Sequence, residues 1–87
     1  MKMHKIKATA RDYEESSGWD TWEKEASEFP WIYPANETCL IIKGSATVTD
    51  IEGNSLEFGI GDLVKFPKGL ECNWKIHSDI EKKYLLH

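Results

Sequence analysis

The sequence predicts an all-β fold, either a closed barrel or a sandwich, on the basis of three observations. From Phe29 onward, short stretches rich in β-branched and aromatic residues are separated by Gly, Pro, Asn and Asp. Within several stretches apolar and polar side chains alternate, which is the pattern of strands with one buried face. The stretches also recur at short, regular spacing. Because 87 residues suffice for one hydrophobic core only, we expect a single domain spanning residues 1–87.

Residues 1–21 are expected to form an irregular N-terminal lead-in to this domain. Charged residues surround Gly18 and Trp19, and neither the helical period of about 3.6 nor the strand period of about two is sustained. Residues 14–17 are compatible with one helical turn at most. A short strand is expected near Trp22, where the lead-in meets the rest of the chain.

The remaining elements are short strands joined by turns. The candidate strands are residues 31–33, 38–42, 46–49, 56–58, 63–66, 73–76 and 82–86. Residues 50–54 contain Gly53 and Asn54, which both tolerate positive φ. We therefore expect a β-hairpin between residues 46–49 and 56–58.

Composition excludes two classes of partner. Fifteen acidic and eleven basic residues give a net charge of −4, whereas nucleic-acid binding relies on clustered Lys and Arg, so no nucleic-acid partner is expected. No apolar run approaches the roughly 20 residues needed to span a bilayer, so no membrane partner is expected either. The first eleven residues lack the apolar core of a secretory signal, which favours a cytoplasmic location.

The alternation identifies which side chains share the interior, because residues two apart on a strand point to the same face. The predicted inward residues include two aromatic pairs, one acid and one lysine. They are Trp31, Tyr33, Glu37, Cys39, Cys72, Trp74, Lys82 and Tyr84. Leu40, Ile42 and Leu85 lie on the opposite face, which implies that the N-terminal segment or a second subunit covers part of the outside. A homodimer is the expected assembly.

The turn residues resemble two sequence motifs of the cupin family. Gly61, Pro67 and Gly69 fit the second cupin motif, G-x5-P-x-G-x2-H-x3-N, with Cys72 at the histidine position and Ile76 at the asparagine position. Glu37 and Gly44 fit the E-x6-G end of the first motif, whose two histidines fall on Trp31 and Tyr33.

The longer segments resemble small single-domain cupins related to the cupin of (S)-ureidoglycine aminohydrolase. They are WEKEASEFPWIYPANETCLIIKG, GDLVKFPKGLECNWKI and KKYLL, within residues 22–87. The resemblance implies a cupin-type antiparallel β-barrel, also called a double-stranded β-helix or jelly roll. The inward residues would then line its lumen.

The resemblance also bears on cofactors. Cupin enzymes typically hold Mn, Fe, Zn or Ni through two or three histidines and one glutamate, and only the glutamate, Glu37, is retained here. We therefore expect no cofactor. If a divalent metal binds, the candidate ligands are Glu37 and Cys72, with Cys39 on the same face. His4, His77 and His87 are expected to be exposed and unliganded, and both cysteines to be free, buried thiols.

Glu37 and Lys82 are the unusual lumen residues, because a buried charge costs several kcal/mol unless it is paired. We expect them to form an ion pair. Three functions remain open at this stage. One is a small-molecule-binding module that uses the aromatic lumen around the acid and the lysine. Another is a metal-dependent enzyme acting on a small nitrogenous or sugar-like metabolite, as the resemblance to ureidoglycine aminohydrolase implies. The third is a filled, purely structural barrel.

Overall fold

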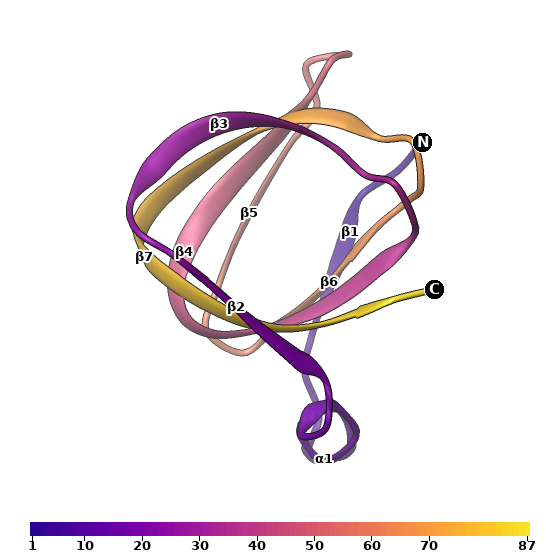
Figure 1. Ribbon diagram of the computed structural model, residues 1–87, viewed down its shortest axis with the longest axis vertical. Coiled ribbons are helices and arrows are strands. Elements are labelled where there is room, and N and C mark those ends of the chain that lie inside the picture. Colours follow the sequence, from indigo (N-terminus) through magenta and orange to yellow (C-terminus); the bar gives the residue numbers. More distant parts are fainter.

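Seven antiparallel strands and one short helix make up the computed structural model, which describes residues 1–87. The elements are β1 (His4–Lys7), α1 (Ala10–Ser16), β2 (Asp20–Lys24), β3 (Ser27–Ile32), β4 (Glu37–Asp50), β5 (Ser55–Gly59), β6 (Asp62–Phe66) and β7 (Glu71–Leu86). The strand order is β1-β6-β4-β7-β2, with β3 paired to β7 and β5 paired to β4. The strands curve around a common interior (Figure 1), which confirms the predicted all-β barrel.

Two long strands, β4 and β7, form the centre of the barrel. Each contains two of the predicted short strands, because residues 38–42 and 46–49 lie in β4 and residues 73–76 and 82–86 lie in β7. The ladder between them has register shifts from Ile41 to Ala46, where the pair bends. Gly44 lies in this bend with a φ of 81°, and a Cβ atom at this position would be 2.2 Å from the carbonyl oxygen of Asp79. Polar residues at the bend resemble turns, which is why each long strand was predicted as two short ones, although the strands continue through the bend.

The expectation of an irregular lead-in over residues 1–21 was wrong. β1 pairs with β6, and Thr9 caps α1 in a capping box with Asp12, whose carboxylate accepts a hydrogen bond from the Thr9 backbone N–H. α1 packs against β4. Leu40 of β4 and Leu63 of β6 are buried yet lie outside the central core cluster, and Leu63 is paired with Ile6 in the ladder between β6 and β1. All four residues of β1 are exposed, which explains why no alternation marked this strand.

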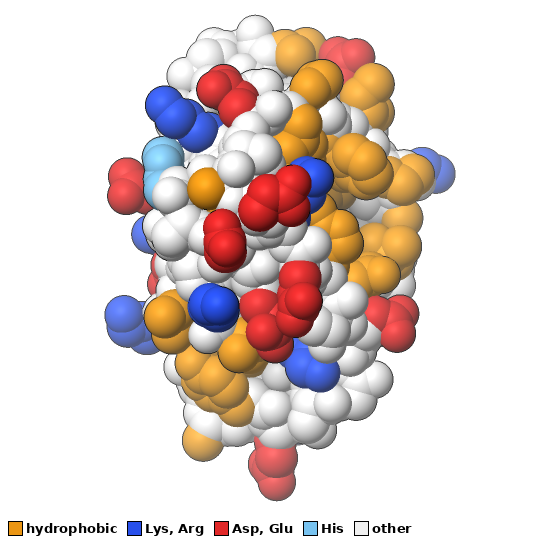
Figure 2. Space-filling model, turned by 60° about the vertical axis from the view of Figure 1, so that its left-hand side comes forward, with side chains coloured by type: hydrophobic (Ala, Val, Ile, Leu, Met, Phe, Trp, Pro, Cys, Tyr) orange, Lys and Arg blue, Asp and Glu red, His pale blue; other side chains and the backbone are white.

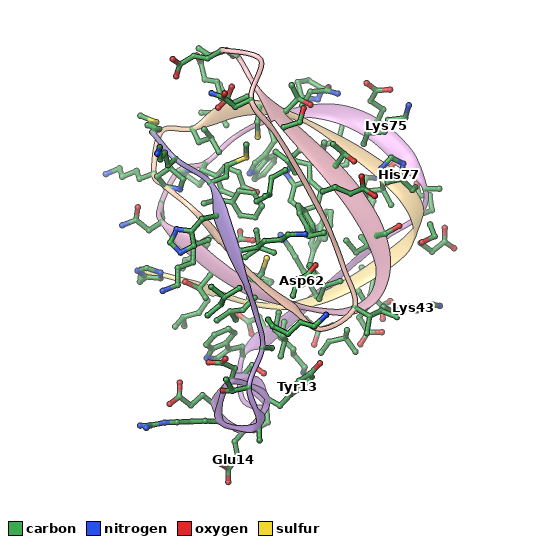
Figure 3. All side chains as sticks on the ribbon, turned by 180° about the vertical axis from the view of Figure 1, so that it is seen from behind. Tyr13, Glu14, Lys43, Asp62, Lys75 and His77 are labelled. Carbon is green, nitrogen blue, oxygen red and sulfur yellow. The ribbon has the colours of Figure 1, made fainter.

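The interior holds a cluster of 13 buried residues rich in aromatic side chains. Alternation along β7 directs Trp74 and Ile76 into this cluster, while Lys75 and His77 point outward (Figure 3). His77 bonds Thr47 through Nε2 at 2.7 Å, and His87 bonds Thr38 at 3.0 Å. His4, His77 and His87 are all exposed, as predicted. The one helix is too short to cross a membrane.

The predicted hairpin joins β4 to β5. Asp50 organises its turn, because Oδ1 accepts hydrogen bonds from the backbone N–H groups of Asn54 and Glu52. These bonds favour the carboxylate, and the bond from the Asn54 backbone contributes most to holding the pKa of Asp50 below its usual range. Gly53 supplies the positive φ of 89° that the turn requires.

Candidate functional site

A cavity of about 610 Å³ is lined by residues of β2, β3 and β7 and by the start of β4. Seven of its twelve lining residues are hydrophobic. The lining residues are Trp22, Lys24, Phe29, Pro30, Trp31, Tyr33, Pro34, Glu37, Trp74, Lys82, Tyr84 and Leu86. Its rim reaches solvent, since Trp31 is 47% exposed and Leu86 is 49% exposed. In Figure 2, hydrophobic side chains gather along the right-hand side of the view, which is the side of the molecule that carries β2 and β3. Charged side chains dominate the centre of the view.

The floor of the cavity contains an ion pair. Lys82 Nζ donates a hydrogen bond to Glu37 Oε2 at 2.6 Å, and the two residues are only 6% and 7% exposed. Glu37 begins β4, whereas Lys82 reaches the same space from β7, opposite Ile41 in the register. The ion pair inferred from strand alternation is confirmed. It compensates two charges that would otherwise be costly to bury.

Aromatic rings surround the ammonium group of Lys82. Its Nζ lies 4.8 Å from the Trp22 ring centroid, 4.9 Å from that of Trp74 and 5.8 Å from that of Tyr84. Ring faces attract cations, so these contacts add to the attraction of Glu37. Phe29 stacks on Trp74 with an interplanar angle of 7°, and Trp22 meets Trp74 edge-on. The arrangement fixes Lys82 in place and gives the cavity flat apolar walls.

Several polar atoms at the floor retain hydrogen-bonding capacity. Glu37 Oε1 has no hydrogen-bond partner in the protein. Every fully enclosed side-chain oxygen or nitrogen has a partner, so Oε1 is not enclosed, and it faces the cavity that Glu37 lines. The hydroxyl oxygen of Tyr33 accepts a hydrogen bond from Trp74 Nε1 at 3.1 Å. Burial and, to a lesser degree, the charge of Glu37 raise the pKa of Tyr33 far above its usual value, so the phenol stays protonated and can donate.

Six of the eight predicted lumen residues line the cavity, and the two cysteines do not. Cys39 is fully buried in the core, and the Cys72 thiol donates to the carbonyl oxygen of Trp31 at 3.5 Å. Both thiols are free. In the ladder between β4 and β7, Cys39 faces Tyr84 at one end and Cys72 faces Asp50 at the other. Burial raises the pKa of Cys39 to about 12 and that of Cys72 to about 11, so both are protonated at neutral pH.

Six further lining residues were missed from the sequence. They are Trp22, Lys24, Phe29, Pro30, Pro34 and Leu86. The same alternation identifies two of them, because Phe29 precedes Trp31 by two positions and Leu86 follows Tyr84 by two. Trp22 and Lys24 share a face of β2, but the sequence offered no contrast that assigned this face to the interior. The two prolines break this parity, and only the path of the chain at the rim places them.

A family model described as the EutQ-like cupin domain matches residues 12–84. The chain belongs to the EutQ-like cupin family. A DUF861 family protein from Thermotoga maritima is 42% identical, with a TM-score of 0.95 over 99% of this chain and 100% of that chain. A search of curated proteins gave no match.

Two larger EutQ proteins share the fold of this cupin domain. The Clostridium difficile EutQ protein is 21% identical, with a TM-score of 0.72 over 98% of this chain and 67% of that chain. A Salmonella typhimurium structure described as ethanolamine utilization protein Q is 17% identical, with a TM-score of 0.70 over 99% of this chain and 69% of that chain. At this level of identity, these two likenesses concern the fold alone.

The residues of this cupin domain do not fit the metal centre typical of cupin enzymes. Trp31, Tyr33 and Cys72 stand where the motifs place histidines, and Glu37 Oε2 is bonded to Lys82. No group of three or more His, Cys, Asp or Glu side chains comes together in the structure. Indole and phenol side chains offer no imidazole nitrogen, so the donor set lacks the ligands that Zn, Mn, Fe or Ni would take from this motif.

Proposed function

We propose that this cupin domain is a small-molecule-binding protein whose ligand occupies the aromatic cavity above Glu37 and Lys82. The observation that carries the proposal is an unfilled space of about 610 Å³ with polar capacity at its floor. Ligand sites are typically concave and mostly apolar, with a few well-placed polar groups, and have volumes of about 300–1,000 Å³. A purely structural barrel would fill this volume with side chains.

The test uses two neighbouring leucines at the C-terminal end of β7. Leu86 lines the cavity and Leu85 does not, although the two are similarly exposed, at 49% and 44%. A panel of small polar metabolites is screened by thermal shift against the wild-type protein. Leu86→Trp should reduce the response to any stabilising compound, because the larger side chain narrows the entrance, whereas Leu85→Trp should preserve it. Equal responses in both variants would contradict the proposed site.

The resemblance to the cupin of (S)-ureidoglycine aminohydrolase suggests a metal-dependent enzyme as the alternative. The ion pair weighs against it, because the one retained ligand, Glu37, is bonded to Lys82. We therefore propose binding without a metal cofactor. Elemental analysis of protein purified without added metal tests this directly, and a stoichiometric metal lost together with thermal stability on chelation would favour the enzyme.

We further propose that two copies of the chain form a homodimer. Large hydrophobic side chains remain exposed at several places, among them Ile32 at the end of β3 and Ile60 in the turn between β5 and β6. Surfaces of this kind are commonly covered by a subunit interface. Sedimentation at micromolar concentration should give the mass of two chains, and a mass equal to one chain would contradict the proposal.

A further inference from the structure

The floor of the cavity carries no net charge. Glu37 and Lys82 neutralise each other at 2.6 Å, and Tyr33 remains an uncharged phenol. The other charged lining residue, Lys24, lies at the partly exposed rim, where it pairs with Glu25 at 3.7 Å. A charged ligand group at the floor would lose its hydration without meeting an unpaired opposite charge. The floor therefore disfavours anions and cations alike.

The same two side chains offer one acceptor and one donor side by side. Glu37 accepts from Lys82 through Oε2 only, which leaves Oε1 free to accept. An ammonium group has three N–H donors, and Lys82 uses one of them on Glu37. A ligand group that donates to Oε1 and accepts from Nζ would satisfy both residues without separating them.

From this juxtaposition we infer the ligand class: an uncharged compound with a donor and an acceptor two or three bonds apart, held by Glu37 Oε1 and Lys82 Nζ. A carboxamide has this chemistry in its N–H and C=O groups, and a vicinal diol has it in its two hydroxyls. The walls formed by Trp22, Phe29 and Trp74 favour a flat, apolar remainder. This inference rests on the proposed function and specifies what the site selects.

Four flat probes of similar size test the selection. Benzamide and catechol are uncharged and carry the donor and acceptor, whereas benzoate is an anion and benzamidinium a cation. Each is titrated into the wild-type protein while the indole N–H signals are followed by NMR. Trp22, Trp31 and Trp74 line the cavity, and Trp19 does not, so it serves as an internal control. We expect benzamide, catechol or both to shift the three cavity signals, with benzoate and benzamidinium binding at least about tenfold more weakly because of the desolvation of their charge.

Charge variants should switch this preference in a defined direction. Glu37→Gln leaves the lysine without its carboxylate, so benzoate should gain affinity over benzamide. Lys82→Met leaves the carboxylate alone, so benzamidinium should gain instead. Glu14→Gln provides the control, because Glu14 is an exposed residue of α1 that points away from the barrel (Figure 3), so its loss should change nothing.

The wild-type titration decides the matter even if a charge variant does not fold. A charged probe that binds the cavity as tightly as benzamide would overturn the inference while leaving small-molecule binding intact. Failure of both uncharged probes to shift any cavity indole at millimolar concentration would also overturn it. The proposed function fails on a separate result, namely that Leu86→Trp reduces the thermal shift of no metabolite in the panel.

Discussion

Breaking the Glu37–Lys82 pair should cost this small domain a large part of its stability. Removing one partner of a buried ion pair typically costs about 3–5 kcal/mol, because the other charge stays buried without compensation. Both residues are almost completely buried, so little solvent screening reduces this cost. For Glu37→Met the three aromatic rings around Lys82 Nζ retain part of the attraction, which places that variant near the lower value.

The size of the domain makes this loss easy to measure. Stability of about 0.05–0.15 kcal/mol per residue gives roughly 4–13 kcal/mol for 87 residues. A loss of about 3 kcal/mol then lowers Tm by about 12–24 °C. Urea unfolding, followed by tryptophan fluorescence, gives the free energy of unfolding for wild type, Glu37→Met, Lys82→Met and the double variant. Because two methionines restore an uncharged, well-filled site, the double variant should be more stable than the sum of the single losses predicts, by about 3 kcal/mol.

An exposed pair provides the control cycle. Arg11 and Glu15 of the α1 helix are 3.0 Å apart, with side chains 85% and 56% exposed. Exposed pairs of this spacing contribute about 0.3–0.5 kcal/mol, so their cycle should show almost no coupling. Additive losses at Glu37 and Lys82, or single losses below about 0.5 kcal/mol, would refute the view that the pair is a buried, mutually dependent unit.

Three further predictions concern other parts of the barrel. Cys39 and Cys72 should react with a thiol reagent only as fast as the protein unfolds, and rapid labelling of the native protein would contradict their burial. Their folded pKa values of about 12 and 11 exceed those of unfolded thiols. The stability that the two protonated thiols contribute is therefore complete below about pH 8.5 and is lost as pH rises towards 11–12. Gly44→Ala should destabilise the protein by several kcal/mol in urea unfolding, because the new Cβ would lie 2.2 Å from the Asp79 carbonyl oxygen. Gly53 has a similar φ but open space around it, so Gly53→Ala should cost only about 1–2 kcal/mol. Equal losses would show that the close approach at Gly44 is unimportant. Asp50→Asn should remove a contribution to the free energy of unfolding that depends on pH. Because the folded pKa of Asp50 is lowered, its carboxylate stabilises the hairpin above the unfolded pKa of about 3.9 and loses this effect as pH falls through the folded pKa. The Tm values of wild type and variant should therefore differ less at low pH than at pH 7.

Strand alternation predicted the interior accurately where one face is consistently apolar. Cys72 and Trp74 alternate with Asn73 and Lys75, and this contrast placed the first pair inside, where both are buried. The same alternation predicted that Lys82 lies on the aromatic face with Tyr84, and the ion pair with Glu37 was predicted from that placement. A buried lysine requires a countercharge, and Glu37 is the acid on the inward face.

Elements that lack this contrast were not predictable. β1 is exposed along its whole length, so only its hydrogen bonds to β6 make it a strand. The bend contains Lys43, Gly44 and Ser45 in β4 and Ser78 and Asp79 in β7, and such residues locally resemble a turn. Alternation also assigns a face without a position along the strand. Cys39 and Cys72 share the interior with the lumen residues, yet the register sets them at opposite ends of the ladder and outside the cavity.

The most direct measurement of the central claim is the response of the four indole N–H signals to the metabolite that most stabilises the protein. Three tryptophans, Trp22, Trp31 and Trp74, surround the proposed site, and Trp19 lies outside it. If the cavity above Glu37 and Lys82 is the binding site, the three cavity signals shift in a saturable manner, the Trp19 signal stays in place, and Leu86→Trp weakens the effect. Saturable shifts confined to Trp19, or stabilisation with no shift at the three cavity indoles, would contradict the account.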